Sequence, residues 1–211
     1  MSQVWRPRTA DLGWAAYVTP LLLPVSFLWD FFSYWILVVR FTFSKGFYTH
    51  QKKVKQVQEQ VQKWKKEGRG RKMCTARPSW MSISQQKLGY KERMFRVRVD
   101  NMQDMLNLNK KKMLVTVEPG ITIGFLNRAL VGMGYTLPVV PELDTLTIGG
   151  LVMGGGIEST SHKHGLFHHQ CTEFEVVTAD GNVVTANKYN NIYLFHALPM
   201  RYVEINSYHM I

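Results

Sequence analysis

The chain has 211 residues, 45% of them hydrophobic, and a formal net charge of +11, enough for one domain with its own core plus an anchor. Its two cysteines, Cys74 and Cys171, exclude a disulfide framework or a zinc pattern, and we expect reduced, buried thiols. Ten Lys or Arg against two Glu lie between Lys45 and Lys72 and supply +8 of the +11. No nucleic-acid-binding motif accompanies this basic block, which directly follows an apolar run and so indicates membrane proximity.

That apolar run, Ala15 to Val39, predicts a transmembrane helix. As a helix it would rise about 37 Å, more than a hydrocarbon core of roughly 30 Å. Pro20 and Pro24 would bend it, and its single charge is Asp30. A buried core helix is the alternative, and the length disfavours a signal peptide. More Lys and Arg follow the run than precede it, which places the rest of the chain in the cytoplasm.

The next element is an amphipathic helix from Gln51 to about Glu67, whose apolar stripe docks on the domain or lies on the membrane. Beyond it, β-branched residues and partial alternation predict strands at Ser82 to Ser84, Met94 to Val99, Met113 to Val117, and Glu173 to Thr178. A turn at residues 118–120 leads into a helix from Ile121 to Met133, and a hairpin turn at residues 179–182 leads into a strand at 183–185. The pattern indicates an α+β fold.

Between these elements lies the most informative stretch, a glycine-rich segment with five glycines in thirteen positions. Its residues are Thr147, Ile148, Gly149, Gly150, Leu151, Val152, Met153, Gly154, Gly155, Gly156, Ile157, Glu158 and Ser159. Glycines expose successive backbone amides, which form a concave anion site suited to a phosphate. The spacing fits neither the Rossmann nor the P-loop fingerprint, and the alternative is a glycine-rich loop between buried strands.

The chain resembles the delta-24-sterol reductase family, membrane-anchored members of the vanillyl-alcohol-oxidase-like flavoproteins. The resemblance rests on residues 115–119, 134–144, 146–154, 156–159, 161–163 and 165–167, with shorter matches at 73–75, 77–78, 80 and 179–181. It implies an FAD-binding domain of the p-cresol methylhydroxylase (PCMH) type, with two α/β subdomains, that is incomplete at its C-terminus and preceded by one transmembrane helix. The implied organisation is a flank at 1–14, the membrane helix at 15–39, a basic juxtamembrane segment at 40–72, the partial FAD domain at 73–199, and a divergent tail at 200–211.

The resemblance also implies an activity: reduction of the sterol side-chain double bond at C24, with hydride passing from NADPH through FAD. The glycine-rich segment then holds the FAD pyrophosphate, and Cys74 to Trp80 is the turn that closes on the cofactor from the other side. This turn lacks the histidine to which some relatives bond the flavin, so FAD is expected to be non-covalent. The implied partners are membrane lipid and a sterol, without nucleic acid, in the endoplasmic reticulum membrane.

For each of the remaining polar residues, the sequence allows a role in a functional site and a purely structural role. The cluster His162, His164, His168, His169 and Cys171 matches no zinc spacing, so surface or cofactor-proximal histidines are favoured over a metal site. Glu142, Asp144 and Glu158 suggest paired carboxylates for acid–base work, but none is assigned as catalytic. Glu142 and Asp144 precede the glycine-rich segment, where hydrogen bonds to backbone or to the FAD ribose are an equal alternative. Arg77 pairs either with a phosphate or with Asp100 or Asp104. Asp30, in the apolar run, either contacts a partner helix or a sterol, or lies at the membrane–water interface.

Three readings therefore compete. The first is a membrane-anchored FAD-dependent sterol reductase, for which no catalytic residue is identified in this chain. The second is a catalytically inactive, truncated fragment that acts only as a membrane-bound FAD-binding or interaction module. The third, a flavin oxidase acting on sugars or phenols, is disfavoured by the membrane run and by the missing histidine.

Overall fold

The structure is a computed structural model that describes residues 46–76 and 92–200, with scattered positions between Pro20 and Val39. The chain divides into two units, residues 1–42 and 43–211, which we describe separately. In the first unit, the described positions are helical and exposed, and Phe31 contacts Phe32 and Trp35 edge to face. The other positions of the predicted membrane run lie outside the described residues. No helix within the described part is both long and apolar enough to cross a membrane.

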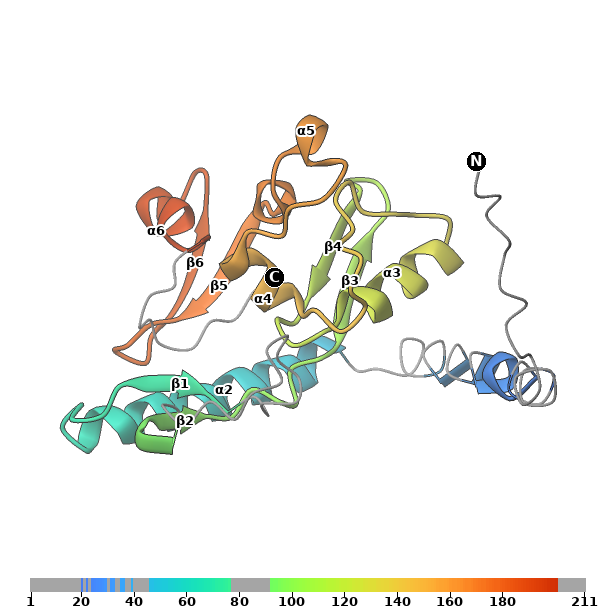
Figure 1. The fold of residues 1–211 in the computed structure, drawn as a ribbon. Helices are drawn as coiled ribbons and strands as arrows, with labels where there is room; N and C mark the ends of the chain where they lie inside the picture. Colours follow the sequence, from blue (N-terminus) through green and yellow to red (C-terminus); the bar gives the residue numbers. More distant parts are fainter. Residues whose placement is uncertain are drawn as a thin grey trace, which may run out of the picture. The chain divides into compact units, whose positions relative to one another are not determined.

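The second unit combines helices with short strands, which confirms the α+β prediction (Figure 1). The strands are β1 (Met73–Thr75), β2 (Phe95–Val97), β3 (Met105–Asn109), β4 (Leu114–Val117), β5 (Glu173–Val177) and β6 (Val183–Asn187). The helices are α2 (Gly46–Lys66), α3 (Ile123–Gly132), α4 (Ile148–Gly154), α5 (Ser161–His164), η3 (Phe167–Gln170) and α6 (Ile192–Ala197). Among these residues β1 pairs parallel with β2, whereas β3 with β4 and β5 with β6 pair antiparallel.

Helix α2 lies along β1 and β2, as Figure 1 shows. Its stripe of Val54, Val57, Val61 and Trp64 is buried in one cluster with four residues of the sheets and connections: Met73, Val97, Met102 and Val177. The indole of Trp64 also donates a hydrogen bond to the carbonyl of Arg71. The amphipathic helix is thus confirmed, and its apolar stripe docks on the domain.

Helices α3 and α4 begin in the same way, because the sequence Thr-Ile-Gly occurs at Thr122–Gly124 and again at Thr147–Gly149. Each threonine is the N-cap, and the two threonines form an antiparallel bridge. Each glycine amide donates to the loop before the other helix: Gly124 to the carbonyl of Asp144 at 3.1 Å, and Gly149 to the carbonyl of Pro119 at 2.8 Å. The two helix starts therefore hold each other in place.

Most predicted elements occur with shifted ends. The strands predicted at 94–99, 113–117 and 173–178 are β2, β4 and β5, and the helix predicted at 121–133 is α3. The hairpin turn before β6 is confirmed by the hydrogen bond from the Thr178 amide to the Asn182 carbonyl. The strand predicted at 82–84 lies outside the described residues.

One prediction is wrong in part: the glycine-rich segment is not a loop throughout, since residues 148–154 form α4. Three glycines should disfavour a helix by about 1 kcal/mol each. Burial of Ile148, Leu151 and Val152 on one face, together with the Thr147 cap, outweighs that propensity.

Candidate functional site

The glycine-rich segment has two parts that differ in what their amides bind. In the first part, the amides of Ile148 and Gly149 donate to the carbonyls of Ile121 and Pro119, at 3.0 and 2.8 Å. The amides of Gly150 and Leu151 donate to the side chain and carbonyl of Thr147. These amides are consumed by the fold, so they are not available to a ligand.

The second part is the turn from Gly155 to Ser159. Gly155 and Gly156 have φ of +91° and +55°, and both of their carbonyls accept from the amide of Phe167. Within the described part of the chain, the amides of Gly155, Gly156, Ile157 and Ser159 make no hydrogen bond to another residue. Ile157 itself is 75% exposed. Successive free amides beside positive-φ glycines have the donor set that an anionic diphosphate requires.

The carboxylates near this turn hold loops. Oε1 of Glu158 accepts from the amide of Glu142 at 3.3 Å, and the Glu158 amide donates to the hydroxyl of Ser161 at 2.9 Å. Oδ2 of Asp144 lies 3.4 Å from Nη2 of Arg128. Glu158 therefore positions the backbone around the turn, whereas the Asp144 side chain forms an exposed ion pair.

The histidine cluster is dispersed over α5 and η3. Nδ1 of His162 lies 2.7 Å from the Ser159 carbonyl, and Nδ1 of His169 accepts from the Leu166 amide at 2.8 Å. Burial, together with the neighbouring His169, lowers the pKa of His168. Among the described residues, no three His, Cys, Asp or Glu side chains gather in a metal-binding arrangement.

Neither cysteine forms a disulfide, and both are half-buried rather than fully buried. Burial raises the pKa of the Cys171 thiol to about 12, so it stays protonated and is a poor nucleophile. Cys171 lines an apolar cavity of about 180 Å³ between α3, α4, η3 and the strands β4 and β5. That volume is below the roughly 300 Å³ at which ligand pockets usually begin.

The predicted second cofactor segment, Cys74 to Trp80, is described only as far as Ala76. Thr75 ends β1, and the Ala76 amide donates to the Val97 carbonyl at 2.8 Å. Arg77 lies outside the described residues. Of its two predicted carboxylate partners, Asp100 lies 3.6 Å from the Arg98 guanidinium and Asp104 lies 2.6 Å from Lys53.

A buried charge cluster that sequence reasoning missed joins α2 to the sheets. Glu118 is fully buried; its Oε1 lies 3.0 Å from Nδ1 of His50, and its Oε2 accepts from Lys53 at 2.8 Å. Lys53 also donates to Asp104, and Nε2 of His50 lies 3.4 Å from Glu175. Buried charges are tolerated only when paired this closely. The cluster fixes the start of α2, and the side-chain partners named above do not include the residues of the turn from Gly155 to Ser159.

This cluster makes stability depend on pH. Desolvation lowers the pKa of His50, but hydrogen bonds to Glu118 and Glu175 outweigh it and hold that pKa above its ordinary value of 6.5. The imidazolium therefore stabilises the fold fully below 6.5, and this contribution is lost as pH rises through the folded pKa. We expect the difference in unfolding free energy between the wild type and His50→Gln to be largest near about pH 6 and smallest near about pH 8.5. Denaturant midpoints across this range test it; a gap that widens with rising pH would contradict the assignment.

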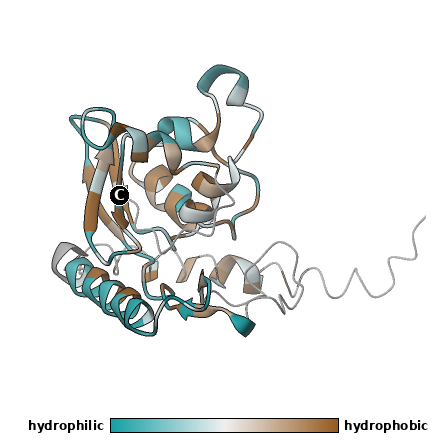
Figure 2. Cartoon of the chain, turned by 90° about the vertical axis from the view of Figure 1, so that its left-hand side faces the viewer, coloured by the Kyte–Doolittle hydropathy of each residue, from teal (hydrophilic) through white to brown (hydrophobic). Residues whose placement is uncertain are grey.

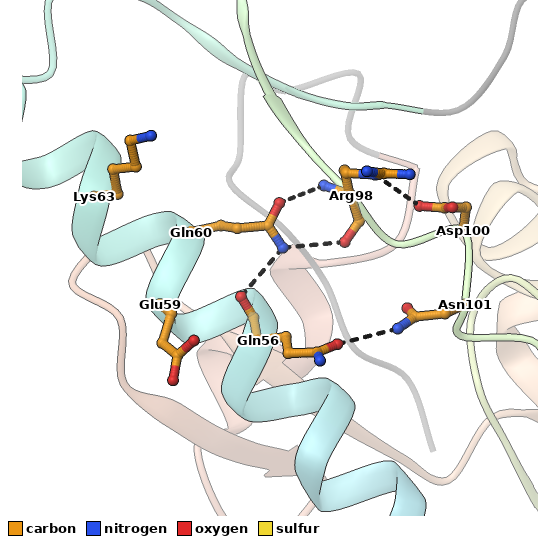
Figure 3. A pocket seen from close by; sticks show the side chains of 7 residues that line it. All are labelled: Gln56, Glu59, Gln60, Lys63, Arg98, Asp100 and Asn101. Carbon is orange, nitrogen blue, oxygen red and sulfur yellow. Dashed lines mark hydrogen bonds and ion pairs between the residues drawn. The ribbon is translucent and has the colours of Figure 1, made fainter.

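A groove of about 480 Å³ lies between α2 and the segment after β2 (Figure 3). It is lined by Gln56, Glu59, Gln60, Lys63, Arg98, Asp100 and Asn101. Gln60 accepts from the amide of Arg98 at 2.7 Å and donates to its carbonyl at 3.3 Å. These two hydrogen bonds of Gln60 hold the segment after β2 against α2. Because the Asp100 carboxylate faces the Arg98 guanidinium, the groove is a poor phosphate site.

A family model described as "FAD binding domain" matches residues 50–187. The Delta(24)-sterol reductase of Homo sapiens is 43% identical over 183 residues, which cover 87% of this chain and 35% of that protein. The enzyme of the same name from Pisum sativum is 37% identical over 202 residues, covering 93% and 35%. The chain thus spans about a third of the length of these relatives.

Solved structures share the fold over a comparable region. The BBE-like 1 protein of Physcomitrella patens superposes with a TM-score of 0.61 and 28% identity over 74% of this chain and 34% of that one. Chitooligosaccharide oxidase gives a TM-score of 0.58 over 69% and 30%, and at 24% identity it speaks for the fold alone. The residues matched by the FAD-binding-domain model, 50–187, contain α3, α4 and the turn that follows α4.

Proposed function

We propose that this chain, which belongs to the FAD-binding-domain family and is a homologue of delta(24)-sterol reductase, binds FAD non-covalently through the turn from Gly155 to Ser159. The single observation that carries the proposal is the row of amides at Gly155, Gly156, Ile157 and Ser159, which no described residue uses. They would donate to the FAD diphosphate, while Thr147 and the α4 face keep the turn in place.

The activity proposed for the protein is that of its relatives: reduction of a sterol side-chain double bond at C24 with NADPH. The bound flavin would supply the hydride chemistry. The contribution of this chain is to bind the diphosphate and to orient the cofactor; no described residue is assigned to the hydride transfer. We further propose single-pass anchorage in the endoplasmic reticulum membrane by residues 15–39, with the domain in the cytoplasm.

The FAD domain is proposed to begin with α2 rather than after it. The family match starts at residue 50, and the apolar stripe of α2 is buried against the sheets. The alternative function is a membrane-bound FAD-binding module without sterol turnover. It is retained because the chain spans only about a third of its relatives.

The proposal predicts a yellow protein. The full chain, purified in detergent, should show the visible absorption of oxidised flavin, and acid precipitation should release FAD into the supernatant because the linkage is non-covalent. Membranes containing the chain are then supplied with NADPH and a side-chain-unsaturated sterol, and the product is measured by mass spectrometry. Turnover supports the reductase, flavin without turnover supports the binding module, and a colourless protein that takes up no added FAD refutes both.

A further inference from the structure

The outer face of α2 carries a row of lysines, Lys52, Lys55, Lys63 and Lys66, here called the lysine row. At about 100° per residue these positions lie along one side of the helix, and they span about 21 Å of its length. All four side chains are exposed, opposite the buried stripe that contains Val57 and Val61. Figure 2 shows this long helix largely in teal on its outer side.

The lysine row is distinct from the other cations nearby, each of which has an internal partner. Lys53 is paired with Glu118 and Asp104. Lys65 and Arg69 share Asp180, and Arg71 pairs with Glu67. In contrast, no carboxylate in the described part of the chain lies within 4 Å of the lysine row.

The fold does not account for these unpaired charges. The stripe and the buried charge cluster already hold α2 in place, and like charges three or four positions apart disfavour a helix. The single acid within the row is Glu59. A straight array of exposed ammonium groups on flexible stems suits an extended anionic surface better than a small ligand.

We propose that the lysine row of α2 binds the head groups of an anionic bilayer and so orients the domain on the membrane. This rests on the membrane anchor proposed above. The apolar run ends at Val39, and α2 begins seven residues later, at Gly46. Seven residues extend at most about 25 Å, so an inserted run would keep the start of α2 within that distance of the end of the run. A helix lying along the surface then brings the whole row to the head groups. Nucleic acid is the less suitable partner, because Trp64, on the same helix, is buried and cannot stack on a base.

The test compares the full chain in nanodiscs of phosphatidylcholine with the chain in nanodiscs that also contain phosphatidylserine. Amine-reactive labelling, read by mass spectrometry, reports each lysine. We expect labelling of the lysine row to fall several-fold with phosphatidylserine and to recover at high salt, while the exposed Lys110, Lys111 and Lys112 stay unchanged. Equal labelling of the row in both nanodiscs overturns the proposal.

Double variants that remove two lysines of the row keep the other two, whose labelling still reports protection. Lys55→Gln/Lys63→Gln should weaken the protection of Lys52 and Lys66, each removed charge contributing roughly fivefold, while Lys110→Gln/Lys112→Gln should not. Glu59→Gln should strengthen the protection, and Glu92→Gln, exposed elsewhere, should not.

Protection by added RNA but not by phosphatidylserine also overturns the proposal. A chain that enters neither nanodisc contradicts the anchor; the row is then tested with phosphatidylserine vesicles, where unchanged labelling refutes it.

Discussion

Replacing Gly156 by alanine is expected to lower the affinity for FAD at least tenfold and to destabilise the domain. A methyl group at this position would lie 2.7 Å from Cβ of Phe167 and 3.2 Å from a methyl of Leu151. The backbone also has φ of +55°, a conformation that costs a residue with a side chain about 1–2 kcal/mol. Together with overpacking, we expect the unfolding free energy to fall by about 2–4 kcal/mol.

The measurements are FAD titration by quenching of flavin fluorescence and denaturant unfolding of the same preparation. Gly70→Ala is the matched control, because a methyl group there has no neighbour within 4 Å and no positive φ to satisfy. It should leave both quantities unchanged. Wild-type FAD affinity in Gly156→Ala would rule out the turn from Gly155 to Ser159 as the diphosphate site.

Neutralising Glu118 as Gln is expected to cost about 3 kcal/mol of unfolding free energy, the usual loss when one member of a buried ion pair is removed. The carboxylate is fully buried and accepts from Lys53 and from the Asp104 amide, both at 2.8 Å. In Glu118→Gln, the neutral side-chain amide no longer balances the Lys53 ammonium, which keeps only Asp104 as a charged partner within the cluster. The start of α2 should loosen first, since His50 and Lys53 both belong to it.

Asp180→Asn provides the contrast. Asp180 also pairs with two cations, Lys65 and Arg69, but this ion pair is exposed, so solvent and salt screen it. Its removal should leave the unfolding midpoint unchanged. Comparable losses in the two variants would show that the Glu118 cluster behaves as an ordinary surface ion pair. Hydrogen exchange of the α2 amides in Glu118→Gln would locate the loosening.

The elements that sequence predicted correctly are those whose pattern is local. Val54, Val57, Val61 and Trp64 repeat at helical spacing, and Asp180-Gly181 occupies a hairpin turn. Helix α4 was missed because its glycines oppose a helix locally, whereas burial of its apolar face and the Thr147 cap act through tertiary contacts. Strand β3 (Met105–Asn109) was also missed, although alternation of leucine and asparagine could have indicated it.

The sequence indicated where a candidate site could lie but not the backbone geometry of that segment. Counting glycines located the segment; it did not reveal that the amides of residues 148–151 are consumed by the fold, whereas no described residue uses those of Gly155, Gly156, Ile157 and Ser159. That distinction depends on Thr147 and on Phe167, whose amide occupies the carbonyls of Gly155 and Gly156. The pairing of His50 with Glu118 was beyond sequence reasoning, because the two residues lie 68 positions apart and each would ordinarily be a surface residue.

The bridge between Thr122 and Thr147 brings together the two ends of the connection formed by residues 123–146. The hydrogen bond from the Ile123 amide to the Leu146 carbonyl, at 2.7 Å, closes its base. Residues inserted or deleted between the end of α3 and Val139 are therefore expected to leave the starts of α3 and α4 in register. The length of this connection can therefore vary among homologues without displacing the Thr147 cap from which α4 begins.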